Sequence, residues 1–129
     1  MAEQSLMVDS SILIDYFRKA DKSKSRLVAH FREYERLYIS SVTEFEVVNG
    51  ATEAHMLFWD GMLSRFIVLG FDSEAARKAA VVVGQLKRKR KSMDKPDLFI
   101  AATALVHGLT LDTLNKRHFE HVEGLMLAE

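Results

Sequence analysis

Three acidic residues stand where predicted strands end or predicted helices begin. Asp9 follows the apolar run Leu6–Val8, Glu46 comes three residues after Thr43, and Asp97 opens an apolar helical segment. Clustered carboxylates repel one another and raise each other's pKa, a cost that a bound divalent cation removes. Hard oxygen ligands suit Mg²⁺ or Mn²⁺, and such an ion can activate a water and orient a phosphodiester. If the fold gathers these acids, the chemistry they favour is metal-dependent phosphodiester hydrolysis.

Each acid taken alone also has an ordinary structural explanation. Asp9 fits a turn residue, and Thr43 with Glu46 forms Thr-x-x-Glu, the pattern of a capping box. Asp97 lies in a first helical turn, where the helix dipole favours any acid. These alternatives stay open for each residue separately. The joint occurrence of all three at places where parallel strands end is what favours a common site.

The spacing of apolar residues predicts strands that alternate with helices. The predicted strands are Leu6–Val8, Leu37–Ile39, Phe66–Leu69 and Leu109–Leu111, with Leu125–Leu127 as a candidate fifth. The predicted helices are Ile12–Phe17, Leu27–Tyr34, Thr43–Val48, Ala51–Leu63, a long one that starts at Asp72 and Ser73, and Asp94–His107. This alternation predicts an α/β fold with a central, mostly parallel sheet of four to five strands and helices on both faces. Right-handed crossovers would bring the polar strand ends to one edge.

Small polar residues, proline and glycine mark the ends of the predicted helices. Ser10 and Ser11 are the expected N-caps of the first helix, because a side-chain oxygen can accept from a free backbone N–H. Pro96 fits the first turn of the last helix, and Gly108 ends it. That last helix is apolar on nearly all sides, so we expect it to be buried in the centre of the fold.

The composition excludes several classes of protein. A chain of 129 residues with 48% hydrophobic residues is expected to form a single domain, residues 1–129. It contains no cysteine, which excludes disulfides, a thiol nucleophile and thiolate metal sites. No apolar stretch approaches the roughly 20 residues that span a bilayer, and the N-terminus lacks a signal-peptide pattern. We therefore expect a cytoplasmic protein without a membrane association.

Three segments, in order along the chain, resemble the PIN-domain ribonucleases, and most closely the VapC toxins of bacterial and archaeal VapBC toxin–antitoxin systems. They are residues 7–15, residues 39–50 and residues 97–119. The second is similar to the family's Ser-x-x-Thr-x-x-Glu-x-x-x-Gly segment, a register that selects Glu46 over Glu44. Together they span most of the chain, which makes the resemblance specific although each segment alone is weak.

The resemblance implies a PIN-like three-layer fold and an endoribonuclease whose Mg²⁺ or Mn²⁺ is held by Asp9, Glu46 and Asp97. The polar residues that it implies as support for the site are Ser10, Ser11, Thr113, Asn115 and Asp112. It also implies an RNA substrate, a cognate VapB-like antitoxin that inhibits the enzyme, and a homodimer. One position departs from the family, because His118 stands where a fourth acid is usual; we expect it on the surface. Asp112 is close to that position but lies within a strand pattern, from which its side chain could point away.

The net charge is zero, but two segments are strongly basic. The first is the unbroken run Lys87, Arg88, Lys89, Arg90 and Lys91, and the second begins at Arg18. A helix end also favours cations, so contact with RNA phosphates and a merely solvated surface remain equal alternatives for the run. Phe58 and Trp59 could stack on bases, but their helical spacing favours a place in the core or at a dimer face.

Two other classes of protein are alternatives to a nuclease. A non-catalytic PIN-like module that binds RNA or a protein partner stays open, because the fourth acid is missing. An aspartyl phosphotransferase or a receiver domain is also small and acidic. A phosphatase of that class needs a second Asp two residues after the first, where this chain has Ser11, and no Asp follows Leu37–Ile39 as a receiver would need.

Overall fold

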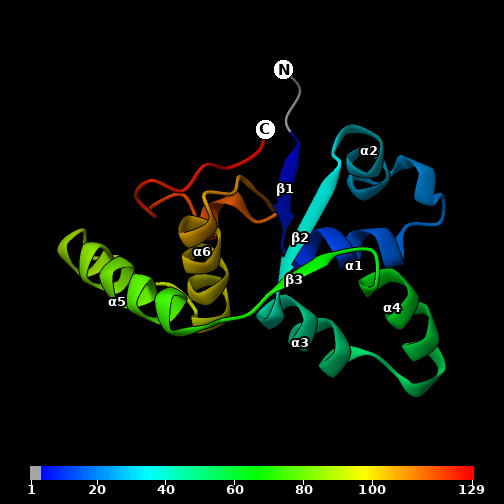
Figure 1. The fold of residues 1–129 in the computed structure, drawn as a ribbon, viewed down its shortest axis with the longest axis horizontal. Coiled ribbons are helices and arrows are strands. Elements are labelled where there is room, and N and C mark those ends of the chain that lie inside the picture. The colour runs from blue at the N-terminus through cyan, green and yellow to red at the C-terminus, as the bar shows by residue number, and fades with distance from the viewer. Residues whose placement is uncertain (1–3) are drawn as a thin grey trace.

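A parallel four-stranded sheet forms the centre of the protein in the computed structural model, which describes residues 4–129 (Figure 1). The strands are β1 (Ser5–Val8), β2 (Arg36–Ser40), β3 (Ile67–Leu69) and β4 (Leu111–Asp112), in the spatial order β3-β2-β1-β4. The α/β fold predicted from the sequence is therefore confirmed. The candidate fifth strand is reduced to one isolated parallel bridge between Leu111 and Leu127.

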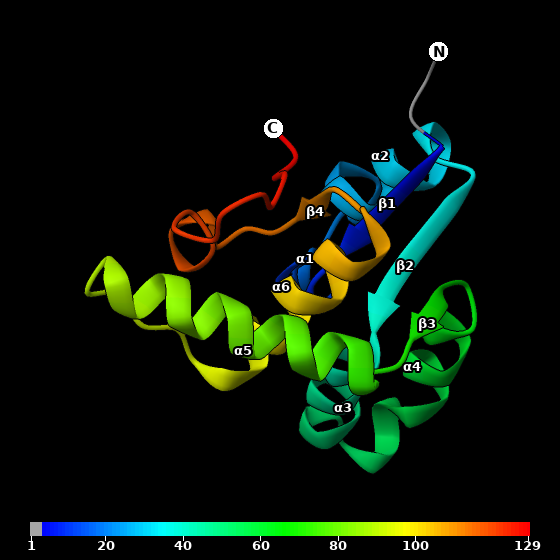
Figure 2. The same cartoon turned by 60° about the vertical axis from the view of Figure 1, so that its left-hand side comes forward.

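Among the described residues, six α-helices and two short 3₁₀ helices connect the strands, and a third 3₁₀ helix follows β4. The α-helices are α1 (Ser10–Arg18), α2 (Arg26–Glu33), α3 (Ser41–Gly50), α4 (Met56–Leu63), α5 (Ser73–Arg88) and α6 (Lys95–His107). The 3₁₀ helices are η1 (Lys22–Lys24), η2 (Glu53–His55) and η3 (Lys116–His118). In Figure 1, α1, α2 and α4 cover one side of the sheet and α5 and α6 the other; Figure 2 shows α5 as a long arm beside α6. None of the described helices is long and apolar enough to cross a membrane.

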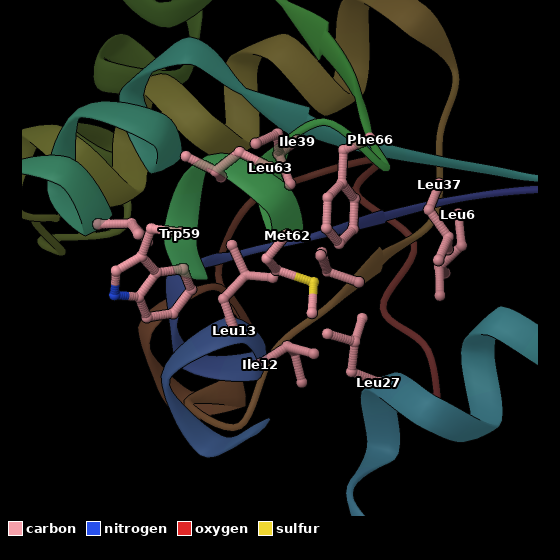
Figure 3. Close-up of a cluster of buried hydrophobic side chains, with 12 residues drawn as sticks. Leu6, Ile12, Leu13, Leu27, Leu37, Ile39, Trp59, Met62, Leu63 and Phe66 are labelled. Carbon is pink, nitrogen blue, oxygen red and sulfur yellow. The ribbon is translucent and has the colours of Figure 1, made fainter. Parts of the chain in front are cut away.

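The sheet has a separate hydrophobic core on each face, because successive side chains of a strand point to opposite faces. In β1, Leu6 and Val8 belong to the core that α1, α2 and α4 cover, where Leu27 and Trp59 are also buried (Figure 3). Met7 points the other way, into the core that α5 and α6 cover. The strand that precedes Asp9 is thus buried on both sides, which fixes the position of its carboxyl end.

Helix α6 is buried as its apolar composition predicts. Its alanines at 101, 102 and 104 are almost completely inaccessible, and small side chains allow α5 to pack closely against it. Pro96 lies in its first turn, and Gly108 ends it in the left-handed region, with φ of 64°, as predicted. The first turn of α6, which carries Asp97, is therefore held in place by the core.

Two helices start two residues earlier than predicted, at Ser10 and Ser41. Asp9, and not Ser10 or Ser11, is the N-cap of α1, because its carboxylate accepts from the backbone N–H of Ser11. Ser40 caps α3 instead of Thr43, so that helix starts earlier than predicted. The predicted helix 51–63 is interrupted at Thr52, whose extended backbone separates α3 from η2 and α4.

Candidate active site

The three predicted acids line one open pocket at the carboxyl edge of the sheet. Asp9 follows β1, Glu46 lies on α3, and Asp97 lies in the first turn of α6. Since all four strands are parallel, the residues that follow them lie at the same edge. The other residues that line the pocket are Ser10, Asp94, Lys95, Pro96, Asn115 and His118.

Asp9 is the most deeply buried of the three acids. It is 3% exposed, and its carboxylate accepts hydrogen bonds from the backbone N–H of Ser11 at 3.0 Å and from the Ser11 hydroxyl. Burial raises the pKa of Asp9, and it outweighs the hydrogen bonds from Ser11 and Thr113, which lower it. The ionised form of Asp9 is thus held by neutral donors and lacks a cationic partner within the described chain.

Glu46 points into the pocket and does not cap its own helix. The Ser10 hydroxyl donates to its Oε1 at 2.9 Å, across 36 residues of sequence. The capping-box interpretation of Thr43 and Glu46 is therefore wrong. Burial raises the pKa of Glu46, and the charges of Asp97 and Asp9 raise it further. This mutual effect is the one expected of carboxylates that share a site.

Asp97 makes a contact that the sequence did not indicate. Its Oδ2 lies 3.0 Å from Nδ1 of His118. The His118 side chain is 54% exposed, so the surface position is correct, but the ring is also a partner of the third acid. Burial raises the pKa of Asp97 and outweighs the hydrogen bond and charge of His118, while Asp94 raises it further.

A network of hydroxyl groups fixes the loop after β4 over Asp9. The Ser11 hydroxyl accepts from the backbone N–H of Leu114 at 2.9 Å and lies 3.4 Å from the Thr113 hydroxyl. The Thr113 hydroxyl accepts from the backbone N–H of Asn115 at 2.9 Å. The structure thus brings four of the five predicted supporting residues, Ser10, Ser11, Thr113 and Asn115, to the acids.

The fifth, Asp112, belongs to a different cluster. Its carboxylate accepts from Arg26 at 2.8 and 2.9 Å and lies 2.6 Å from Nε2 of His30. Burial opposes its ionisation, but the hydrogen bonds and charges of His30 and Arg26 together hold its pKa below the usual value. Asp112 points toward α2, where Arg26 and His30 lie. Of the two alternatives that the sequence left open for Asp112, the structure therefore shows the side chain that points away from the other acids, and not the supporting position beside them.

The predicted RNA-binding residues occupy two places. Arg18 lines a hollow with Ser10, Ser11 and Asn115, next to the acids. The run from Lys87 to Lys91 ends α5 and is exposed; within it, Lys89 donates to the carbonyl of His121 at 3.1 Å and lies 3.7 Å from Glu123. Binding of RNA by either group stays a prediction.

The aromatic residues of α4 are core residues. Trp59 is buried, and Phe58 packs against the same hydrophobic cluster, with its ring centroid 5.1 Å from that of Trp59. The preference for a core position over base stacking is confirmed for both.

One pocket residue had a signal in the sequence that was missed. Asp94 lies three residues before Asp97 and precedes the first turn of α6, with no capping hydrogen bond from its side chain. An acid at that spacing from Asp97 lies at the same helix end, which is why it lines the pocket and raises the pKa of Asp97.

The types of residue in the pocket fit a hard divalent cation. Three carboxylates with raised pKa face it, and within residues 4–129 none of them is paired with Lys or Arg. Oxygen ligands of this kind suit Mg²⁺ or Mn²⁺. In the same range, however, no three His, Cys, Asp or Glu side chains are arranged so that they could hold a metal ion as they stand. Glu46 is turned to Ser10 and Asp97 to His118.

Comparison with known proteins agrees with this arrangement. The model of the PIN domain family matches residues 6–125. Ribonuclease VapC1 of Methanocaldococcus jannaschii is 31% identical over 125 residues, which cover 94% of this chain and 83% of that relative. The tRNA(fMet)-specific endonuclease VapC of Salmonella typhimurium is 32% identical over 99 residues, 73% of this chain and 75% of that one.

Solved structures give the same result. A chain in the crystal structure of DNA-bound VapBC from Salmonella typhimurium superimposes with a TM-score of 0.82 and 27% identity, over 97% of each chain. A chain of the toxin–antitoxin complex from Klebsiella pneumoniae has a TM-score of 0.74 and 29% identity, over 94% of this chain and 95% of that one. The chain therefore belongs to the PIN domain family and, within it, to the VapC ribonucleases.

Proposed function

We propose that this protein is a metal-dependent endoribonuclease, the toxin of a VapBC-type toxin–antitoxin system, which hydrolyses phosphodiester bonds in RNA. The observation that carries the proposal is the pocket in which Asp9, Glu46 and Asp97 meet. Each of these carboxylates has a raised pKa, and none has a Lys or Arg partner in the described chain. Carboxylates that gather without a Lys or Arg partner repel one another and destabilise a fold, and a bound cation would relieve that repulsion.

In this proposal Asp9, Glu46 and Asp97 hold Mg²⁺ or Mn²⁺. When bound, the ion would activate the attacking water and offset charge on the phosphodiester. The residues around the acids orient them: Ser10 holds Glu46, and His118 holds Asp97. Ser11 and the N-terminus of α1 hold Asp9. Such supporting residues limit the positions of the carboxylates before metal or substrate arrives.

The family's cleavage targets suggest a first substrate to test. Relatives in Salmonella typhimurium and Shigella flexneri carry the name tRNA(fMet)-specific endonuclease VapC. We extend this substrate to the present chain as a proposal and take initiator tRNA as the first RNA for a cleavage assay.

The proposed partners are a second copy of the chain and a cognate VapB-like antitoxin, within the cytoplasm. Structural relatives are complexes named VapBC, in which the toxin has an antitoxin partner. Exposed apolar side chains on α3, α4 and the edge strand β3 support a homodimer: Phe45, Leu57 and Ile67 are all large and accessible. A second copy that packs against these elements would cover these apolar side chains.

A cleavage assay tests the proposal. Wild-type protein with Mn²⁺ or Mg²⁺ should cut initiator tRNA at a defined position, and a chelator should stop it. Asp9→Asn should cut far more slowly, whereas Asp60→Asn, the same change at an exposed position on α4, should cut as the wild type does. Cleavage that survives both the chelator and Asp9→Asn would exclude the proposed mechanism.

The second candidate is a non-catalytic PIN-like module that binds RNA or a protein partner. It is favoured by the lack of an arrangement ready to hold a metal among residues 4–129, and by His118 at the position of the usual fourth acid. A calorimetric titration with Mn²⁺ separates the two functions. Binding that Asp9→Asn removes supports the nuclease, and no binding to the wild type supports the module.

A further inference from the structure

A second hollow adjoins the acidic pocket and carries the opposite charge. It lies between α2 and the segment from the end of β4 through η3, and its cationic walls are Arg26, Lys116 and Arg117. Asn115 and His118 line both this hollow and the acidic pocket. The two sites are therefore continuous, with Asn115 and His118 as the boundary between them.

Two of the three cations of this hollow are uncommitted, whereas Arg26 is paired with the buried carboxylate of Asp112. Within the part of the chain that the structure describes, Lys116 and Arg117 have no ion pair and no side-chain hydrogen bond. The one acid in the wall, Glu120, lies 3.6 Å from His121 instead. Exposed lysines and arginines are common, but two uncommitted cations beside Arg26 at one concave surface, with the neighbouring acid turned elsewhere, give a positive potential that favours an anion.

The hollow is also held in shape. Phe119 is buried and anchors the end of η3 in the core under α5 and α6. The backbone N–H groups of His118 and Phe119 donate to the carbonyls of Asn115 and Lys116. On the opposite wall, the buried carboxylate of Asp112 fixes the guanidinium of Arg26 through two hydrogen bonds. The positive charges thus stand on rigid backbone, which reduces the entropy lost when a ligand binds.

We propose that this hollow, here called the basic hollow and defined by Arg26, Lys116 and Arg117, binds a backbone phosphate of the RNA strand next to the phosphate that is cleaved. The proposal rests on the proposed nuclease function, because it takes the acidic pocket as the place of cleavage. Three carboxylates repel an RNA backbone, and an adjacent cationic surface offsets that repulsion. The boundary residues Asn115 and His118 then lie beneath the strand as it passes from one site to the other.

The basic hollow differs from the basic run at the end of α5. The run is longer, but Lys89 is already engaged by His121 and Glu123. None of its five residues lines the acidic pocket or the basic hollow, whereas the hollow shares Asn115 and His118 with the pocket. We infer that the basic hollow sets the register of the RNA at the cut site. Removal of its charges should therefore weaken the contact with one phosphate of the RNA. Removal of a distant charge pair should not weaken the contact with any single phosphate.

The test compares two double variants that remove the same two charges. K116Q/R117Q neutralises the basic hollow. R77Q/K78Q neutralises an adjacent pair on α5 that lines neither the acidic pocket nor the basic hollow. Both are made in Asp9→Asn, so that initiator tRNA binds without being cut, and unchanged thermal unfolding shows that each is folded. Arg26 stays intact because its removal would leave buried Asp112 without its main cation.

Two measurements decide the outcome. In K116Q/R117Q, the slope of log affinity against log salt should fall by roughly 0.7 for each single-strand phosphate that the variant no longer neutralises, and R77Q/K78Q should keep the slope of its parent. Single methylphosphonates, which remove one phosphate charge, are then placed around the mapped cut site. A methylphosphonate at one position beside the cut site should weaken RNA binding by the Asp9→Asn parent. The same methylphosphonate should not change RNA binding by K116Q/R117Q.

An equal fall in slope for both double variants would overturn the basic hollow as a specific site, as would a methylphosphonate profile that K116Q/R117Q leaves unchanged. If the wild type cleaves and binds RNA in either of these cases, the proposed function survives and the hollow alone is rejected. If the wild type neither binds nor cleaves RNA, both proposals fall.

Discussion

Asp9 and Asp112 end neighbouring parallel strands, and the two residues are joined by a backbone hydrogen bond of 3.2 Å. Both carboxylates are buried, at 3% and 0% exposure. Asp112 has the guanidinium of Arg26 and the ring of His30, and its pKa is lowered. Asp9 has hydroxyl and backbone donors but no cation in the described chain, and its pKa is raised. Burial alone therefore does not distinguish the two acids; the presence or absence of a cationic partner does.

The difference follows from the face to which each side chain points. Asp112 turns toward α2, where Arg26 and His30 lie, and the pair of strands is tied to that helix. Asp9 turns toward the open edge, where Glu46 and Asp97 add negative charge. The carboxylate of Asp112 stabilises the fold. The carboxylate of Asp9 is held close to other negative charges, and a divalent cation would offset their repulsion.

The largest expected effect is a loss of stability when Asp112, the structural member of this pair, is changed. Asp112→Asn should lower the free energy of unfolding by roughly 3–5 kcal/mol, because it leaves Arg26 and His30 without their buried counter-charge. Chemical denaturation measures this loss. RNA cleavage per folded molecule should fall far less than in Asp9→Asn, because Asp112 does not line the acidic pocket and acts on the RNA only through Arg26. A variant as stable as the wild type would remove the distinction between the two aspartates.

The same substitution at the other member should act on activity. Asp9→Asn should lower the cleavage rate by about 10²–10³-fold, the range for removal of one group that stabilises transition-state charge. Its stability should match or exceed that of the wild type, since Asn keeps the N-cap of α1 and the charge repulsion is relieved. Rates on initiator tRNA and denaturation of the same sample give both values, and a clear loss of stability would contradict the comparison.

Metal should stabilise the wild type through the acidic pocket. At a hundredfold excess of Mn²⁺ over its dissociation constant, the stabilisation is about 2.7 kcal/mol. Thermal unfolding with and without Mn²⁺ should show this increase in the wild type and in Asp60→Asn. It should disappear in Asp9→Asn, and an equal shift in all three proteins would place the metal elsewhere.

A smaller effect is expected when an orienting residue is removed. Ser10→Ala takes away the hydroxyl that holds Glu46, and loss of such a partner typically costs about 10–100-fold in metal affinity or activity. Mn²⁺ titration and cleavage rates should fall together. Ser64→Ala, an exposed serine outside the pocket, should change neither.

The smallest effect is in the pH dependence of stability without metal. The folded pKa values of Asp9, Glu46 and Asp97 lie above their usual values of 3.8, 4.5 and 3.8, so the folded protein binds more protons than the unfolded chain at pH just above these values. Stability contributed by these groups should therefore fall as the pH rises through that range. Asp112 has a lowered pKa, so its contribution is present above pH 3.8 and is lost as the pH falls through its folded value. Denaturation over this range should give a shallower decline with rising pH for Asp9→Asn than for the wild type.

Much of the fold could be predicted from local pattern. The four strands and the six main helices follow from the spacing of apolar residues, and the stop at Gly108 follows from its conformational freedom. The cap of α1 was misplaced because Asp9, Ser10 and Ser11 are all good caps. Which of the three residues caps the helix depends on the neighbours that each side chain meets in the folded chain.

The types and topological positions of Asp9, Glu46 and Asp97 were determined by the sequence alone, because strand ends of a parallel sheet meet at one edge. The direction in which each side chain points was decided only by the tertiary structure. Ser10 meets Glu46 across 36 residues, His118 meets Asp97 across 21, and Arg26 meets Asp112 across 86. Such long-range partners leave no periodic signal along the chain. They nevertheless determine the electrostatic environment, and hence which of two buried aspartates supports the fold and which faces the pocket.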